Sequence, residues 1–165
     1  MPGLAVAAVA LLLLAAVAEA ASGARVVRDP RFDTPYLSGH GRVDITRATA
    51  ARDLGVVRHS VTMRSPARPA RPGERPAIII NTRGGRRSPY EYIALGSTIF
   101  RVPARGAPRA VGAAALTSKR RRWSYRFDLD DVPGLGAGYG WAALTQRRGG
   151  DLADVAPDRG YVPSP

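Results

Sequence analysis

The sequence predicts an all-β protein, an antiparallel and jelly-roll-like β-sandwich of about eight short strands that follows an N-terminal signal helix. Short apolar or alternating segments recur along the chain and are separated by many of its 14 Pro and 18 Gly residues. After the first 20 residues, no long segment shows the period of an amphipathic helix. A closed barrel built from the same strands is the alternative arrangement.

The clearest strand covers residues 121–129, where Trp123, Tyr125 and Phe127 alternate with Arg122 and Arg126. Alternation with a period of two places the aromatic side chains on one face and the arginines on the other, as in a half-buried strand. A turn at residues 52–55 is expected to join two further strands as a hairpin. The other expected strands are 43–51, 56–64, 77–82, 90–95, 98–102, 110–117 and 139–145.

An unbroken apolar run from Leu4 to Ala18 opens the chain. It is short for a transmembrane helix and has the length of a signal-peptide core, and Ala18-Glu19-Ala20 then offers a cleavage site. We therefore expect a secreted, extracellular protein with no transmembrane anchor in its mature chain. A buried N-terminal helix or an uncleaved anchor is the alternative. The expected division is a signal peptide at 1–20, a flexible segment at 21–28, the sandwich at 29–160 and a C-terminal tail at 161–165.

The chain is strongly basic, with 25 Lys and Arg residues against 13 Asp and Glu residues, a net charge of +12. Lys119 is its one lysine, and it has no cysteine, so the domain must be stable without disulfides. This charge predicts attraction to anionic surfaces, which for an exported protein are wall polymers or anionic lipids. The abundance of Arg, Ala, Gly and Pro also matches a GC-rich genome, so part of the charge can reflect codon usage.

Catalytic motifs are missing from the sequence, and we expect no enzyme. His40 and His59 are the two histidines, no G-x-S-x-G element occurs, and the mature chain has few glutamates for paired-carboxylate chemistry. Zinc is not expected without cysteine or a histidine pair. Nucleic acid is not expected either, because the aromatic residues of 121–129 alternate onto the face opposite Arg122 and Arg126.

Aspartates gather near both ends of the predicted sandwich, around residues 29–44 and 151–158. The ends of a domain often lie close together, and calcium prefers several oxygen ligands from loop aspartates. Calcium is therefore a candidate cofactor. Turn capping and ion pairs with the many arginines are the alternative roles of these carboxylates.

Several short segments resemble a group of small secreted actinobacterial proteins of unassigned activity, and these in turn distantly resemble DOMON-like domains and family 9 carbohydrate-binding modules. The segments are Asp29-Pro30-Arg31-Phe32-Asp33, Asp44-Ile45, Ile79-Ile80-Asn81-Thr82, Tyr90-Glu91-Tyr92 and Asp154-x-x-Pro157-Asp158. The resemblance implies a non-catalytic sandwich with a structural calcium, whose ligands would be Asp29, Asp33, Asp44 and Asp158. Where the pattern usually has Asp-Thr, this chain has Asn81-Thr82, which removes a possible ligand.

Taken together, the sequence predicts a secreted, non-catalytic β-sandwich that binds saccharide or cell-wall polymer. Aromatic side chains commonly form the surface on which such ligands rest, and the candidates are Trp141, Tyr139 and Tyr36. A core position for Trp141 is the competing interpretation. The alternative functions are a basic, wall-associated protein that acts by non-specific electrostatic binding and a structural domain without a small ligand.

Overall fold

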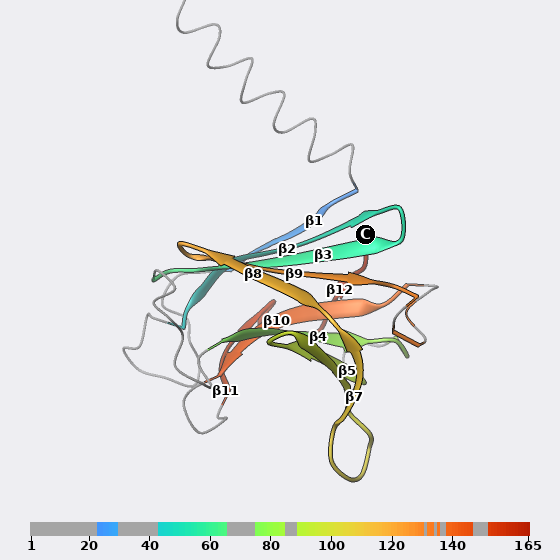
Figure 1. The fold of residues 1–165 in the computed structure, drawn as a ribbon. Helices are drawn as coiled ribbons and strands as arrows, with labels where there is room; N and C mark the ends of the chain where they lie inside the picture. The colour runs from blue at the N-terminus through green and yellow to red at the C-terminus, as the bar shows by residue number, and fades with distance from the viewer. Residues whose placement is uncertain are drawn as a thin grey trace, which may run out of the picture.

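The computed structural model describes residues 23–29, 43–65, 75–84, 89–130, 132–133, 135, 138–146 and 152–165. In these ranges the chain forms twelve strands in two facing antiparallel sheets and no helix (Figure 1). The all-β, two-sheet class is thus confirmed, although the strands outnumber the eight or so expected. The expected signal helix at 1–20 lies outside the described residues. Within the described ranges, no helical segment has the length and apolar character needed to cross a bilayer.

Sheet A contains five strands in the order β1-β2-β3-β9-β8. Its hairpin turn between β2 and β3 falls at Leu54 and Gly55, which have φ values of 46° and 85°. Two successive positive φ values are typical of the tight two-residue hairpin turn, so the hairpin predicted across 52–55 is present. The strands are β1 (Arg25–Arg28), β2 (Ile45–Asp53), β3 (Val56–Met63), β8 (Ala115–Lys119) and β9 (Arg122–Asp128).

Sheet B contains seven strands, in the order β11-β10-β4-β5-β6-β7, with β12 paired to β10. Consecutive strands are mostly hydrogen-bonded neighbours, so the two sheets are built from meanders, not from the nested Greek keys of a jelly roll. The strands are β4 (Pro76–Asn81), β5 (Tyr92–Leu95), β6 (Thr98–Arg101), β7 (Arg109–Ala113), β10 (Gly140–Gln146), β11 (Leu152–Ala156) and β12 (Val162–Pro163).

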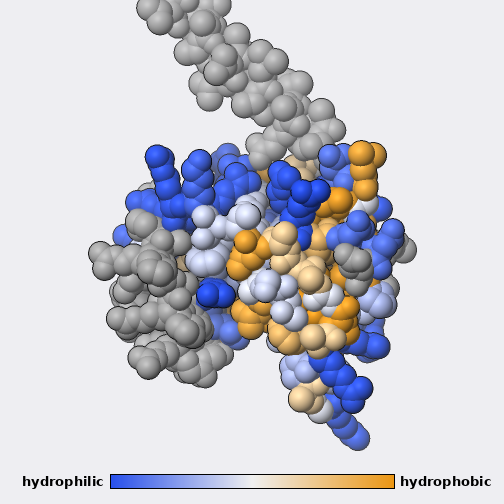
Figure 2. Space-filling view, viewed as in Figure 1, coloured by the Kyte–Doolittle hydropathy of each residue, from blue (hydrophilic) through white to orange (hydrophobic). Residues whose placement is uncertain are grey.

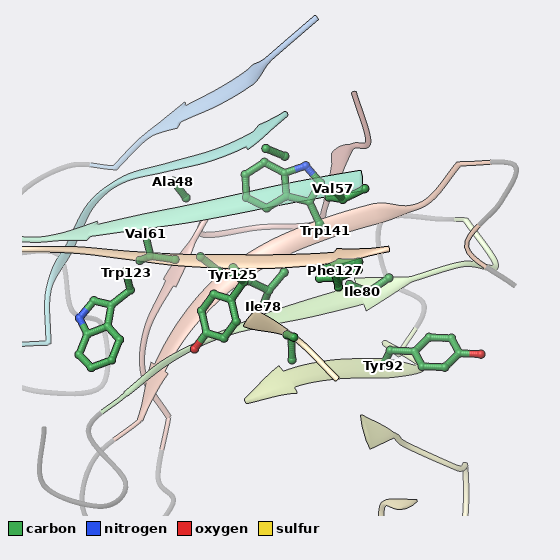
Figure 3. Close-up of a cluster of buried hydrophobic side chains, with 14 of the residues drawn as sticks. Ala48, Val57, Val61, Ile78, Ile80, Tyr92, Trp123, Tyr125, Phe127 and Trp141 are labelled. Carbon is green, nitrogen blue, oxygen red and sulfur yellow. The ribbon is translucent and has the colours of Figure 1, made fainter. Parts of the chain in front are cut away.

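The main core lies between the sheets and contains side chains of the alternating strand β9 and of the continuously buried strands β4 and β10. In β9, Trp123, Tyr125 and Phe127 are buried, whereas Arg122 and Arg126 are exposed. Figure 3 shows Tyr125 pointing from β9 towards β4, and Ile78 and Ile80 of β4 belong to the same buried cluster. The remaining fully buried large side chains include Trp141, Ile45, Ile78, Ile80, Ile99, Leu135, Val57 and Val61.

The two terminal segments differ from the sequence-based division of the chain. Arg25–Arg28, expected to be flexible, forms β1 and pairs with β2, and Val162–Pro163 of the expected tail pairs with β10. Each of these short strands is stabilised by backbone pairing with a longer strand, and its own sequence does not reveal this pairing. β11 was also not predicted, and its pairing with β10 includes Asp154, whose carboxylate accepts a hydrogen bond from the Ile45 amide at 2.6 Å.

The predicted strand 110–117 proves to be two strands that belong to different sheets. β7 is an edge strand of sheet B and β8 is an edge strand of sheet A. Ala114 lies between them, is buried, and donates its amide to the Ser97 carbonyl oxygen at 3.0 Å. The residues around this point are Ala and Gly, whose small size leaves room for the chain to bend from one sheet to the other.

Candidate functional site

Two of the predicted ligand-binding aromatic residues lie in the core. Trp141 has no exposed surface and Tyr139 is only 7% exposed. Figure 3 shows Trp141 reaching from β10 towards Val57 of sheet A. Both residues are buried, which corrects the prediction that they form an exposed surface for a saccharide, although Tyr139 contributes to the lining of a cleft at one end of sheet B. Tyr36, the third candidate, lies outside the described residues.

These rings are buried because they enclose His59 of β3. The Nε2 atom of His59 lies 2.9 Å from the Tyr139 hydroxyl oxygen, and its ring stacks on Phe127 with centroids 5.8 Å apart. The Trp141 ring meets the imidazole edge-on at 4.9 Å. Burial lowers the pKa of His59 to about 3 and raises the pKa of the Tyr139 hydroxyl. His59 is therefore a neutral core residue at physiological pH.

The predicted calcium ligands occupy different environments. Asp29 and Asp44 are buried, Asp158 is exposed, and Asp33 lies outside the described residues. Among the residues that the structure describes, no three His, Cys, Asp or Glu side chains are placed to hold a metal ion. The described carboxylates therefore do not form the donor set that calcium requires.

A different group of polar side chains meets at one end of sheet B. Ile80 pairs with Tyr92, Asn81 pairs with Gly140, and Tyr92 also pairs with Arg101. This register brings together the end of β4, the start of β5, the end of β6 and the start of β10. The β6–β7 connection projects from the same end (Figure 1).

An ion pair between Arg83 and Glu91 lies at the centre of this end. Arg83 Nε is 2.8 Å from Glu91 Oε1, while Thr82 donates its backbone amide to Glu91 Oε2 at 2.8 Å and its hydroxyl at 3.1 Å. Glu91 is 11% exposed at its side chain and Arg83 is 70% exposed. The carboxylate is thus held by the strand ends, whereas the guanidinium extends into solvent.

Two tyrosines accompany this ion pair. Tyr90 directly precedes Glu91, and Tyr161 precedes β12; both are half-buried. The pKa of the Tyr161 hydroxyl is raised by burial first and then by the charges of Glu91 and Tyr90. Gly140 permits this arrangement, because a Cβ atom there would lie only 2.8 Å from the Cβ of Tyr161.

Two adjoining clefts share Arg83, and we call them together the Arg83–Glu91 groove. One has a volume of about 600 Å³ and includes Tyr161; the other, of about 940 Å³, includes Tyr90 and Glu91 and runs along the β6–β7 connection. Ligand sites in proteins commonly have volumes of about 300–1,000 Å³. The second cleft is additionally lined by Arg101, Arg105 and Arg109.

The sequence offered a weak signal for this groove. The Tyr90-Glu91-Tyr92 segment and the strand end Asn81-Thr82 were both recognised in the sequence, but nothing there paired Glu91 with Arg83 or placed Tyr161 beside them. Comparison with family models, curated proteins and solved structures finds no match to this chain. The DOMON-like and carbohydrate-binding-module resemblance therefore remains an expectation from the sequence.

Proposed function

We propose that this chain is an exported, non-catalytic β-sandwich that binds a saccharide or a saccharide-bearing cell-wall polymer in the Arg83–Glu91 groove. The observation that supports this most strongly is the Arg83–Glu91 pair, which lies in a groove of suitable volume with a half-buried tyrosine on either side. Export is inferred from the apolar run at 4–18.

The chemistry of the groove suits sugar hydroxyls. A hydroxyl both donates and accepts hydrogen bonds, and the groove offers a carboxylate acceptor beside a guanidinium donor. Tyrosine rings add an apolar face that ends in a polar hydroxyl, which suits a sugar ring with apolar C–H faces and polar edges. The resemblance to family 9 carbohydrate-binding modules favours the same ligand class.

Co-sedimentation of the purified protein with insoluble polysaccharides and bacterial wall material, at low and high salt, tests this proposal. The wild-type protein should sediment with one polymer at both salt concentrations, because hydrogen bonds in a groove are screened less than exposed charges. Glu91→Gln should weaken this binding about tenfold, the effect of losing one charge-assisted hydrogen bond.

Arg159→Ala is the matched control for Arg83→Ala, because each removes one exposed arginine and Arg159 lines neither of the two clefts. Arg83→Ala should weaken binding and Arg159→Ala should leave it unchanged. If both variants lose binding equally and high salt abolishes it, the protein is instead a wall-associated protein that acts by non-specific electrostatic attraction. No sedimentation with any polymer would favour a structural domain without such a ligand.

A further inference from the structure

The outer face of sheet A carries ordered rows of basic and hydroxyl side chains. Strand register aligns the outward residues, because directly paired residues project to the same side of a sheet. The first row crosses all five strands: Arg28, Arg47, Thr62, Arg122 and Lys119. The next row contains Val26, Thr49, Ser60, Ser124 and Thr117, and the third contains Ala51, Arg58, Arg126 and Ala115.

The cationic side chains on this face are exposed to solvent. Arg47, Arg58, Arg122, Arg126 and Lys119 are all exposed. Figure 2 shows hydrophilic side chains projecting from the upper side of the molecule, where Figure 1 places sheet A. We call this surface the basic face; its cations are Arg28, Arg47, Arg58, Arg122, Arg126 and Lys119.

The carboxylates within the described strands of sheet A lie at one end of the basic face, whereas the buried Asp29 and Asp44 adjoin the strand ends at the other. Asp53 and Asp128 are both paired with Val56, next to the β2–β3 turn. The first row, at the other end, contains no acid among its five members. Arg122 faces Lys119 across the strands, and like charges placed directly opposite one another repel. An anion bound along this row would relieve that repulsion.

A small hollow lies between the first two rows. It has a volume of about 190 Å³ and is lined by Arg47, Thr49, Ser60, Thr62 and Arg122. At about 30 Å³ per water molecule, this is the space of about six waters, enough for one phosphate group of five heavy atoms. Among the residues that the structure describes, its lining consists of two guanidinium groups and three hydroxyls.

Hydrogen bonds orient one side of the hollow. The Arg122 guanidinium donates to Ser60 Oγ at 3.0 Å, and Ser60 Oγ lies 3.0 Å from Ser124 Oγ. Arg122 therefore leans across the sheet over β3, with its remaining N–H groups available above the hydroxyls. A planar guanidinium fork matches the oxygen geometry of phosphate better than a lysine ammonium does.

We infer that the basic face is a second binding site, distinct from the Arg83–Glu91 groove, which takes a linear polymer of phosphodiesters with one phosphate in the hollow. Strands lie about 4.8 Å apart, so the first row extends over about 19 Å across the five strands. A chain crossing the strands meets several cations in succession. The phosphodiester-linked polymers of bacterial walls have this chemistry, whereas neutral saccharides lack the charge to use it.

Calorimetric titration of the purified protein with soluble poly(glycerol phosphate) tests the inference, with polyglutamate of matched charge as the carboxylate comparison. The phosphate polymer should bind at least about tenfold more tightly, and Arg122→Lys should remove most of that preference while keeping the charge. Arg159→Lys, the same substitution at an exposed residue outside both sites, should change neither affinity. Ser60→Ala should weaken phosphate binding without changing the net charge.

Three outcomes would overturn the inference. The first two are equal affinity for the two polymers and an equal effect of Arg122→Lys and Arg159→Lys. The third, in a co-sedimentation assay, is binding to phosphatidylglycerol vesicles without binding to poly(glycerol phosphate). The last outcome would assign the basic face to a membrane surface. Glu91→Gln should leave the affinity for poly(glycerol phosphate) unchanged, so failure at the groove and failure at the basic face can be told apart.

Discussion

Acidification should destabilise this protein through His59, whose imidazole is enclosed between the sheets. The ring contacts Phe127, Tyr139 and Trp141, and its Nδ1 atom is buried without a hydrogen-bond partner. Burial lowers the pKa of His59 from 6.5 to about 3. Tyr139, its titratable ring neighbour, has a raised pKa and stays protonated in acid. The folded state therefore favours neutral His59, and protonation favours the unfolded chain.

The expected loss of stability follows from these pKa values. The contribution of neutral His59 is fully present above pH 6.5, the unfolded value, and is lost as the pH falls from 6.5 towards about 3. The free energy of unfolding changes by about 1.36 kcal/mol per pH unit in this interval. Between about pH 6.5 and about pH 4.5 the loss is about 2.7 kcal/mol, a large part of the 5–15 kcal/mol or so that stabilises a typical domain.

Urea denaturation of the wild-type protein and of His59→Gln, from about pH 7.5 to about pH 4.5, measures this contribution. At neutral pH the variant should be less stable, because glutamine cannot reproduce the ring contacts. Carboxylates titrate alike in both proteins, so the stability difference isolates His59. That difference should shrink by about 2.7 kcal/mol as the pH falls. A difference that stays constant over the whole range would refute this reasoning.

Three other substitutions test the packing described above by the same urea assay. Trp141→Ala should lower the free energy of unfolding by about 3–5 kcal/mol, and a loss below about 1 kcal/mol would contradict its place in the core. Gly140→Ala should cost about 1–3 kcal/mol by displacing Tyr161, and an unchanged free energy of unfolding would contradict this close contact. Leu54→Asn should raise stability by about 1 kcal/mol, because Leu54 is 97% exposed at a φ of 46° that asparagine tolerates better; unchanged or lower stability would speak against strain at this turn.

Two of the strands that form the core could be predicted because their own sequences place core-facing residues at every second position. β9 alternates buried residues with exposed or half-buried ones, and in β3 every second residue from Val57 to Met63 is buried; each strand was predicted to within a residue or two. β1, β11 and β12 have no such pattern and owe their strand structure to pairing with β2 and β10. Pairing between distant segments is not visible in a local pattern of residues.

The direction of Trp141 could not be predicted for a related reason. In β10 the five residues from Trp141 to Thr145 are all buried, so period-two alternation does not distinguish an inner face from an outer one. The candidate sites depend even more on lateral register. Arg122 and Lys119 lie close in sequence, but their alignment with Arg47 requires the pairing of β9 with β3 and of β3 with β2.

The direct passage of the chain from β7 to β8 affects the local unfolding of the sandwich. Edge strands of the two sheets are covalently continuous through Ala114, which is itself buried and hydrogen-bonded to Ser97. Opening the sheets along this side would have to break pairing in both of them at once. Local opening there should therefore require a larger free energy than fraying of β1, an edge strand of four residues whose pairing is to β2 alone.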